Sequence, residues 1–435
     1  MVIASLFANT TMFSSKSAAG RIAGVLFVTL LAALPGRAYA QILSPEPQRR
    51  GCDWTEPNSN TAYPETNARY FRLPIPRARA RGLRLRIEGD YLASRYFSYQ
   101  LYGALFNALD VIADHQIEPD AGSQSPFVGP TRIDPGVKAG GRYTVFVVFS
   151  DKPSRPAPNT LYAGTNALPR LRNYLFLRAY LPDGPIPLPT FRYEDENGRP
   201  AADGLIGKAA CADTADDGSR RSAAPGTVAA GNAGTEAPAT AALARDSRDV
   251  PFEVYRGLGP AGSGVVYNQD AGFMSARIED RDTLVLVRFR APSYPRLRGP
   301  VVADVRYWSL CQNRQALQTV IACVADRDAA VDRSGFFHAV VGDLAGRPVG
   351  ATARRGFSYL PNAGLLDNGF LIYRQLLART DFPGAIRRVP EGSAPEAVLG
   401  DYAPQATTCP RRVFSARSAA GDSAAQVFAA CRAAR

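Results

Sequence analysis

Hydrophobic positions along the chain fall in short segments separated by turn-forming residues. The segments at 83–87, 95–102, 173–180 and 284–290 are rich in β-branched and aromatic residues, which is typical of strands. The 3.6-residue period of a helix is clearest at 423–430, near the C-terminus. The pattern predicts an all-β fold of two tandem, related β-sandwich or jelly-roll domains, with a short C-terminal helical tail.

The prediction of two related domains comes from an order of features that occurs twice. The motif R-Y-[F/W]-S begins at Arg95 and again at Arg306, and each copy is followed by an aspartate in the sequence A-D. Later in each copy an apolar strand contains a single arginine. The matched features are 83–87 with 284–290, Arg95 with Arg306, Asp114 with Asp326, 143–149 with 336–341, and Arg178 with Arg374.

Composition sets the expected boundaries of these two domains. Residues 213–249 are mostly Ala, Gly, Ser, Thr and Asp without apolar periodicity, which indicates a flexible linker or a long surface loop. The first domain is therefore predicted at 41–212 and the second at 250–403. Residues 404–435 form the predicted tail.

The N-terminal segment has the pattern of a cleaved export signal. Lys16 and Arg21 precede an apolar run at 22–34, and the sequence A-Y-A ends at Ala40. The run is too short for a bilayer of about 30 Å, so no transmembrane anchor is predicted. We expect cleavage near Ala40 and a secreted or periplasmic protein, with translation starting at the first or the twelfth residue, both of which are Met.

The cysteines support an oxidising compartment. An even number, six, predicts three disulfides, and no C-x-x-C motif indicates a redox pair or a zinc site. Fifteen pairings are possible, of which the sequential one is the simplest. It joins Cys52 to Cys211, Cys311 to Cys323, and Cys409 to Cys431. No metal or cofactor is predicted.

The chain is basic, with a formal charge of +12, and loss of residues 1–40 removes three positive charges and leaves +9. An exported basic protein is expected to meet an anionic envelope polymer or lipid head group rather than nucleic acid. The densest basic stretch places many of its arginines at alternate positions, on one face of an extended segment. That face is either a binding surface or an ordinary solvated sheet face. Its members are Arg72, Arg77, Arg79, Arg81, Arg84 and Arg86.

Several strands resemble those of exported bacterial proteins of unknown function that have duplicated jelly-roll domains. R-Y-F-S-Y-Q-L-Y at 95–102 is similar to their aromatic-Trp-Ser strand. N-T-L-Y at 159–162, followed by L-F-L-R-A-Y-L-P at 175–182, resembles their ending, and 359–361 with 371–374 looks like a second copy. The resemblance implies a β-sandwich fold and no established chemistry.

Asp114 and His115 form the one adjacent acid–imidazole pair in the sequence, and Glu118 follows. These three residues are the candidates for general acid–base catalysis of glycan cleavage. The alternative is structural. An arginine within an apolar strand needs a buried partner, so Asp114 would pair with Arg178. The same brace would be repeated in the second domain between Asp326 and Arg374.

A candidate ligand-binding face lies on the strand at 95–102. Side chains alternate along a strand, so Tyr96, Ser98, Gln100 and Tyr102 share one face, and the residues between them point to the core. Aromatic rings beside hydroxyl and amide groups suit a sugar ring. Ordinary cross-strand packing is the alternative.

Other motifs exclude several classes of enzyme. The sequence has no G-x-S-x-G, H-E-x-x-H or G-K-[S/T], and its G-x-G-x-x-G at 257–262 precedes a strand rather than a helix. The function expected from the sequence is binding of a saccharide or envelope polymer. A glycan-cleaving enzyme that uses the first-domain acids, or a structural envelope protein, are the alternatives.

Overall fold

The computed structural model describes most of the chain after residue 53. The described residues are 54–57, 60–76, 82–165, 172–201, 248–255, 267–278, 283–296, 302–342, 346–362 and 368–434. All of them belong to one compact unit. The predicted cleavage site near Ala40, nearly all of the predicted linker at 213–249, the glycine motif at 257–262 and the pairing of Cys52 with Cys211 lie outside the described residues.

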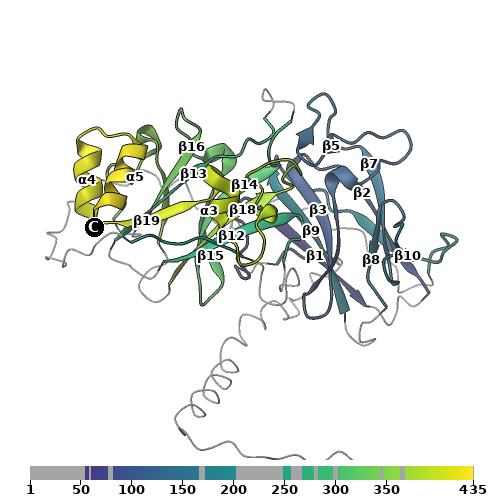
Figure 1. Ribbon diagram of the computed structural model, residues 1–435. Coiled ribbons are helices and arrows are strands. Elements are labelled where there is room, and N and C mark those ends of the chain that lie inside the picture. Colours follow the sequence, from purple (N-terminus) through teal and green to yellow (C-terminus); the bar gives the residue numbers. More distant parts are fainter. Residues whose placement is uncertain are drawn as a thin grey trace, which may run out of the picture. The chain divides into compact units, whose positions relative to one another are not determined.

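The first sandwich contains two four-stranded sheets, with strand orders β1-β9-β3-β4 and β10-β2-β7-β8 (Figure 1). A short hairpin of β5 and β6 is attached to it. The strands are β1 (Ala68–Pro76), β2 (Arg84–Asp90), β3 (Ser94–Tyr102), β4 (Ala108–Ala113), β5 (Phe127–Gly129), β6 (Arg132–Ile133), β7 (Arg142–Val148), β8 (Thr160–Tyr162), β9 (Arg172–Pro182) and β10 (Thr190–Glu194).

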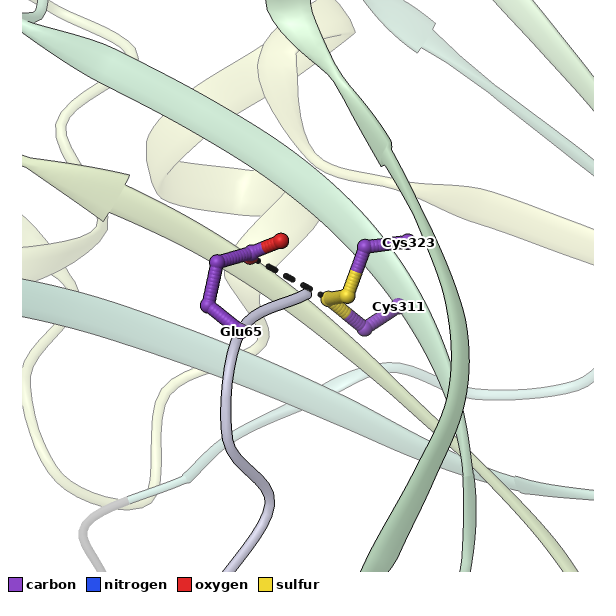
Figure 2. A group of neighbouring side chains, drawn as sticks. All are labelled: Glu65, Cys311 and Cys323. Atoms are coloured by element: carbon purple, nitrogen blue, oxygen red, sulfur yellow. Dashed lines mark hydrogen bonds between the residues drawn. A yellow bond between two sulfur atoms is a disulfide. The ribbon is translucent and has the colours of Figure 1, made fainter. Parts of the chain in front are cut away.

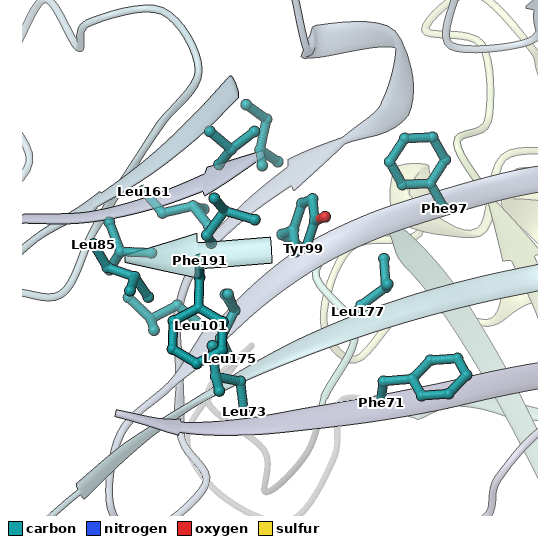
Figure 3. Close-up of a cluster of buried hydrophobic side chains, with 14 of the residues drawn as sticks. Phe71, Leu73, Leu85, Phe97, Tyr99, Leu101, Leu161, Leu175, Leu177 and Phe191 are labelled. Atoms are coloured by element: carbon teal, nitrogen blue, oxygen red, sulfur yellow. The ribbon is translucent and has the colours of Figure 1, made fainter. Parts of the chain in front are cut away.

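Apolar side chains from both sheets meet in the core of the first sandwich. Phe97, Tyr99 and Leu101 of β3 are fully buried there, as the alternation of the sequence predicts. Figure 3 shows these three side chains with Leu85 of β2 and Phe191 of β10, which come from the facing sheet. Burial of each such side chain contributes about 1.5–3 kcal/mol to the driving force for folding.

The second sandwich contains sheets with strand orders β11-β12-β18-β14-β15 and β17-β16-β13-β19. Its strands are β11 (Glu253–Val254), β12 (Ala271–Ile278), β13 (Leu284–Arg290), β14 (Tyr307–Arg314), β15 (Thr319–Ala325), β16 (Phe336–Gly342), β17 (Ser358–Pro361), β18 (Gly369–Leu376) and β19 (Gln405–Cys409). Three short helices follow β18 in sequence: α3 (Pro395–Leu399), α4 (Arg411–Ala419) and α5 (Ala424–Ala433). The all-β fold with a short C-terminal helical tail is as predicted.

The second sandwich repeats the topology of the first. The order β1-β9-β3-β4 corresponds to β12-β18-β14-β15, and β10-β2-β7-β8 corresponds to β19-β13-β16-β17. In both copies the pair at one edge, β7 with β8 or β16 with β17, is parallel and the other pairs are antiparallel. Register agrees as well, because Arg178 lies opposite Ser98 and Arg374 lies opposite Ser309. The predicted internal repeat is therefore present.

Two of the predicted disulfides fall within the described residues, and both have the predicted pairing. Cys311 is bonded to Cys323 on neighbouring strands β14 and β15, and Cys409 of β19 is bonded to Cys431 of α5. Such bonds fit an extracytoplasmic protein. Among the described helices, none has the length and apolar character needed to span a bilayer.

Candidate functional site

Four of the residues predicted to act in catalysis or binding contact the second half of the chain: Asp114, Tyr96, Gln100 and Tyr102. Asp114 directly follows β4, at the first position of the 3-10 turn η2 (Asp114–Gln116), and its side chain is fully buried. Its carboxylate accepts hydrogen bonds from the backbone N–H of Phe97 (3.0 Å) and of His115 (2.6 Å). The Nη1 of Arg306, from the second sandwich, lies 3.0 Å from Asp114 Oδ2.

Arg306 is enclosed as completely as its partner. Besides Asp114, its guanidinium donates to the backbone carbonyls of Pro130 (2.7 Å), Gly129 and Arg95 (3.3 Å). Burial lowers the pKa of Arg306, and the adjacent carboxylate opposes that shift. A buried ion pair with this many hydrogen bonds is an arrangement that holds two surfaces together.

The same pair recurs with the sandwiches exchanged. Asp326 begins the 3-10 turn η3 (Asp326–Asp328), accepts the backbone N–H of Trp308 (3.2 Å) and pairs with Nη1 of Arg95 (3.3 Å). Burial raises the pKa of Asp326 to about 6, although Arg95 and the backbone donors oppose this. The two arginines of the R-Y-[F/W]-S motif therefore each reach the aspartate of the other copy.

The prediction that Asp114 pairs with Arg178, and Asp326 with Arg374, was wrong. Arg178 instead donates to the side chains of Gln100 and Tyr102. Arg374 lies 3.4 Å from Glu65, which precedes β1 in the first sandwich. The repeat identifies corresponding residues, but it does not reveal that the partners come from the other copy.

The predicted ligand-binding face is not an outer surface. Tyr96, Ser98, Gln100 and Tyr102 do share one face of β3, but each is 0 % exposed. The segment before β12 covers them. The carbonyl of Tyr267 accepts hydrogen bonds from Gln100 Nε2 (2.8 Å) and Tyr102 Oη (2.9 Å).

Tyr96 makes the third contact to this segment, donating from Oη to Asp270 Oδ2 at 2.6 Å. Burial raises the pKa of Tyr96, and it raises that of Tyr102 to about 12, so both phenols stay protonated at neutral pH. The expectation of an exposed sugar-binding face was therefore wrong. The alternation of side chains shows which residues share a face, but not what covers that face.

His115 and Glu118 lie closer to solvent than Asp114. The His115 side chain is partly exposed, with Nδ1 3.6 Å from Asp114 Oδ1. Glu118 is exposed, and its backbone N–H donates to Asn159 Oδ1 (2.7 Å). The three predicted catalytic residues are thus near in sequence, but the carboxylates of Asp114 and Glu118 are in different environments, one buried and ion-paired and the other in solvent.

Sequence reasoning missed Glu65, Tyr267 and Asp270. They lie in matching turns before β1 and β12. Ala68 N–H donates to Glu65 O (3.2 Å) in one turn, and Ala271 N–H donates to Asn268 O (3.1 Å) in the other. The signal that could have identified these turns is the pair E-T-N-A at 65–68 and N-Q-D-A at 268–271.

One cluster in the described part of the chain has side chains of metal-binding type, Glu65 with Cys311 and Cys323 (Figure 2). Cys311 Sγ lies 3.3 Å from Glu65 Oε2. Both sulfurs are tied in a disulfide, so neither is a thiolate that could ligate a cation. The carboxylate is also occupied, because it accepts Ser309 Oγ–H (2.6 Å) and faces Arg374. The cluster is a structural contact between the sandwiches.

A second group of charged side chains lies on the outward face of sheet β10-β2-β7-β8, and we call it the arginine face. Alternate residues of β2 point away from the core, as predicted for this basic stretch. Arg77, Arg79 and Arg81 lie outside the described residues. The arginine face consists of Arg84, Arg86 and Glu88 of β2, Phe146 of β7, and Arg192 and Glu194 of β10.

Comparisons with known proteins leave the function open. No family model and no curated protein matches the chain. It is similar to the solved structure of an uncharacterized protein from Burkholderia cenocepacia, with 12% identity, a TM-score of 0.45, and coverage of 84% of this chain and 88% of that one. It is also similar to the VPA0106 protein of Vibrio parahaemolyticus, with 9% identity, a TM-score of 0.36 and coverage of 80% and 92%. At these scores the similarities carry no inference about function.

Proposed function

We propose that the chain is an exported protein that binds an anionic polymer of the cell envelope and does not cleave it. The observation that carries this proposal is the placement of charge. The acid at the centre of the predicted catalytic group, Asp114, is buried and ion-paired, whereas arginines of β2 and β10 are partly exposed on an outward sheet face. Fixed surface guanidiniums are suited to carboxylates, sulfates and phosphates.

Hydrolysis of a glycan by the predicted acids is the weaker interpretation. Glycosidases place two carboxyl groups about 5–10 Å apart on either side of the scissile bond. Asp114 cannot serve as one of them without losing Arg306 and two backbone donors. Its role is to join the two sandwiches.

Export is supported by the signal pattern that ends at Ala40 and by the two disulfides. In that compartment the basic chain meets acidic polysaccharides and other anionic envelope polymers. An exported location also disfavours nucleic acid as the ligand class.

A thermal-shift and binding panel tests the proposal on the chain from Gln41 onward. Polygalacturonate and heparin are the anionic probes and dextran is the neutral one. At about 100 times its dissociation constant, a bound polymer stabilises the fold by about 2.7 kcal/mol. We expect stabilisation by the anionic polymers only, weakening with salt. Absence of any shift, or release of reducing ends from the polymer, would contradict the proposal.

A further inference from the structure

The internal repeat allows the arginine face of the first sandwich to be compared with the corresponding sheet face of the second. Register fixes the correspondence, because Leu85 lies opposite Val147 in the first sandwich and Val285 lies opposite Val341 in the second. Each outward residue of the first sandwich can then be matched to one of the second. Arg84, Arg86, Phe146 and Glu194 correspond to Leu284, Leu286, Val340 and Cys409.

In the second sandwich this face is closed. Leu284, Leu286 and Val340 are buried beneath α4 and α5, in a cluster that includes Phe414 and Phe428. Figure 1 shows the two helices beside β19. The disulfide from Cys409 to Cys431 holds α5 in place. The chain thus covers an apolar sheet face with its own tail.

In the first sandwich three of these four matching positions carry charge instead: Arg84, Arg86 and Glu194. The side chains of Arg84, Arg86 and Arg192 are 31%, 27% and 36% exposed. Three arginines and the two glutamates, Glu88 and Glu194, leave this face with a charge of +1. With arginines in place of leucines, this face is unsuited to packing against apolar helices and suited to binding an anionic ligand.

The two glutamates hold the guanidiniums in position without neutralising all of their positive charge. Glu194, which is fully buried, lies 2.7 Å from Arg84 Nη2 and 3.3 Å from Arg192 Nε. Glu88 lies 3.0 Å from Arg86 Nη2 and 3.2 Å from Arg192 Nη1. A guanidinium has five N–H donors, so these bonds leave donors for a ligand.

Phe146 contributes an aromatic ring over which two of these guanidiniums lie. The Cζ of Arg84 lies 4.3 Å from the centre of the ring and that of Arg86 lies 5.7 Å away. These cation–π contacts help to position the guanidiniums, which are suited to the repeated carboxylates of an acidic polysaccharide. Among the described residues, the exposed large aliphatic side chains lie on segments other than β2, β7 and β10.

We propose that the arginine face binds an acidic polysaccharide, with its carboxylate groups on Arg84, Arg86 and Arg192. This inference rests on the proposed function and assigns its site. The ligand binds to the first sandwich, on the sheet face that corresponds to the one covered by α4 and α5 in the second sandwich.

The test compares two triple variants that remove the same charge. Arg84→Gln, Arg86→Gln and Arg192→Gln change the arginine face. Arg69→Gln, Arg290→Gln and Arg417→Gln are the matched control, since each of these arginines is at least partly exposed and paired with an acid elsewhere. Affinity for polygalacturonate is measured by calorimetry at several salt concentrations, with dextran and phosphatidylglycerol vesicles as further probes.

We expect the face variant to lose at least tenfold in affinity for polygalacturonate and the control to lose less than threefold. Equal losses in both variants would overturn the assigned site while leaving the proposed function intact. Absence of polygalacturonate and heparin binding by the unmodified protein would overturn both. Binding to phosphatidylglycerol vesicles that polygalacturonate does not displace would identify a lipid surface instead and overturn the inference.

A lysine variant keeps the test decisive if loss of Arg84 leaves Glu194 buried without its charge partner and the glutamine variant fails to fold. Arg84→Lys, Arg86→Lys and Arg192→Lys preserve the charge but not the bidentate geometry. Circular dichroism checks the fold of every variant. We expect at least a threefold loss of polygalacturonate affinity in the lysine variant, and an unchanged affinity would overturn the assigned site.

Discussion

Two buried arginine–aspartate pairs link the R-Y-[F/W]-S motif of each sandwich to the other sandwich. Arg306 with Asp114 is the more deeply enclosed pair, since both side chains are 0 % exposed. Ions taken out of water in this way depend on each other, because removal of one leaves an uncompensated buried charge.

Substitution of Arg306 by Met is expected to reduce the free energy of unfolding by about 3–5 kcal/mol. Arg69→Met, which breaks an exposed pair with Glu56, should cost no more than about 1 kcal/mol. Urea unfolding followed by fluorescence measures both. Similar effects of the two substitutions would show that the buried pair does not hold the sandwiches together.

The raised pKa of Asp326 predicts a pH dependence of stability. Folding raises this pKa from 3.8 to about 6, because burial penalises the carboxylate. The folded state therefore binds a proton that the unfolded state has lost between these values. The resulting stabilisation is full below pH 3.8 and is lost as pH rises through 6.

Relative to Asp326→Asn, which does not titrate, the unmodified protein should lose roughly 1–3 kcal/mol of stability between pH 4 and pH 6.5. Unfolding free energies of the two proteins at both pH values provide the measurement. A constant difference would show that Asp326 has an ordinary pKa in the folded state.

The sequence predicts the two faces of β3 but not what covers them. Alternation correctly placed Phe97, Tyr99 and Leu101 in the core and Tyr96 and Gln100 on the opposite face. What covers that opposite face depends on Tyr267 and Asp270, more than 160 residues away in sequence. A pattern local to one strand contains no information about such a distant partner.

At the scale of elements, the tail of helices α4 and α5 depends on one covalent link. The bond between Cys409 and Cys431 closes a loop with a sequence separation of 22, which corresponds to about 3 kcal/mol of stabilisation in the chain-entropy model. The bond between Cys311 and Cys323 joins strands that are already hydrogen-bonded, so it adds less local constraint.

Replacement of Cys409 and Cys431 by Ala should therefore increase amide hydrogen exchange throughout α4 and α5. The matched replacement of Cys311 and Cys323 should leave exchange in these helices unchanged. Mass spectrometry of both variants resolves the difference. If α4 and α5 keep their protection without the bond, packing against Leu284 and Leu286 alone secures the tail.

The sequence predicted the strands and their duplication better than it predicted individual contacts. Short apolar segments bounded by turn residues predicted the strands, and the repeated order of features predicted a duplication that strand order and register reproduce. The strand register was needed to compare the arginine face with the sheet face that α4 and α5 cover. The sequence alone does not align Arg84 with Leu284, because an arginine and a leucine show no similarity that would mark the two positions as equivalent.

For the whole molecule, the contacts between the sandwiches predict coupled unfolding. Ring centres of Tyr180 and Tyr307 lie 5.3 Å apart, within a shared buried cluster of both sandwiches. We expect calorimetry to show one transition. A variant with Arg95→Met and Arg306→Met should unfold at a lower temperature, because both arginine–aspartate pairs are lost. It should keep a single transition, because the contacts of Glu65, Tyr267 and Asp270 remain. Two transitions in the unmodified protein would mean that the sandwiches unfold independently.

We propose that the protein binds its ligand through the arginine face and not through the acids between its sandwiches. Arginine labelling with phenylglyoxal, read by mass spectrometry with and without saturating polygalacturonate, tests it directly. We expect the polymer to protect Arg84, Arg86 and Arg192 at least fivefold, while Arg69 and Arg417 label as before. Uniform protection of all five arginines, or labelling at Arg84, Arg86 and Arg192 that polygalacturonate does not change, would contradict it.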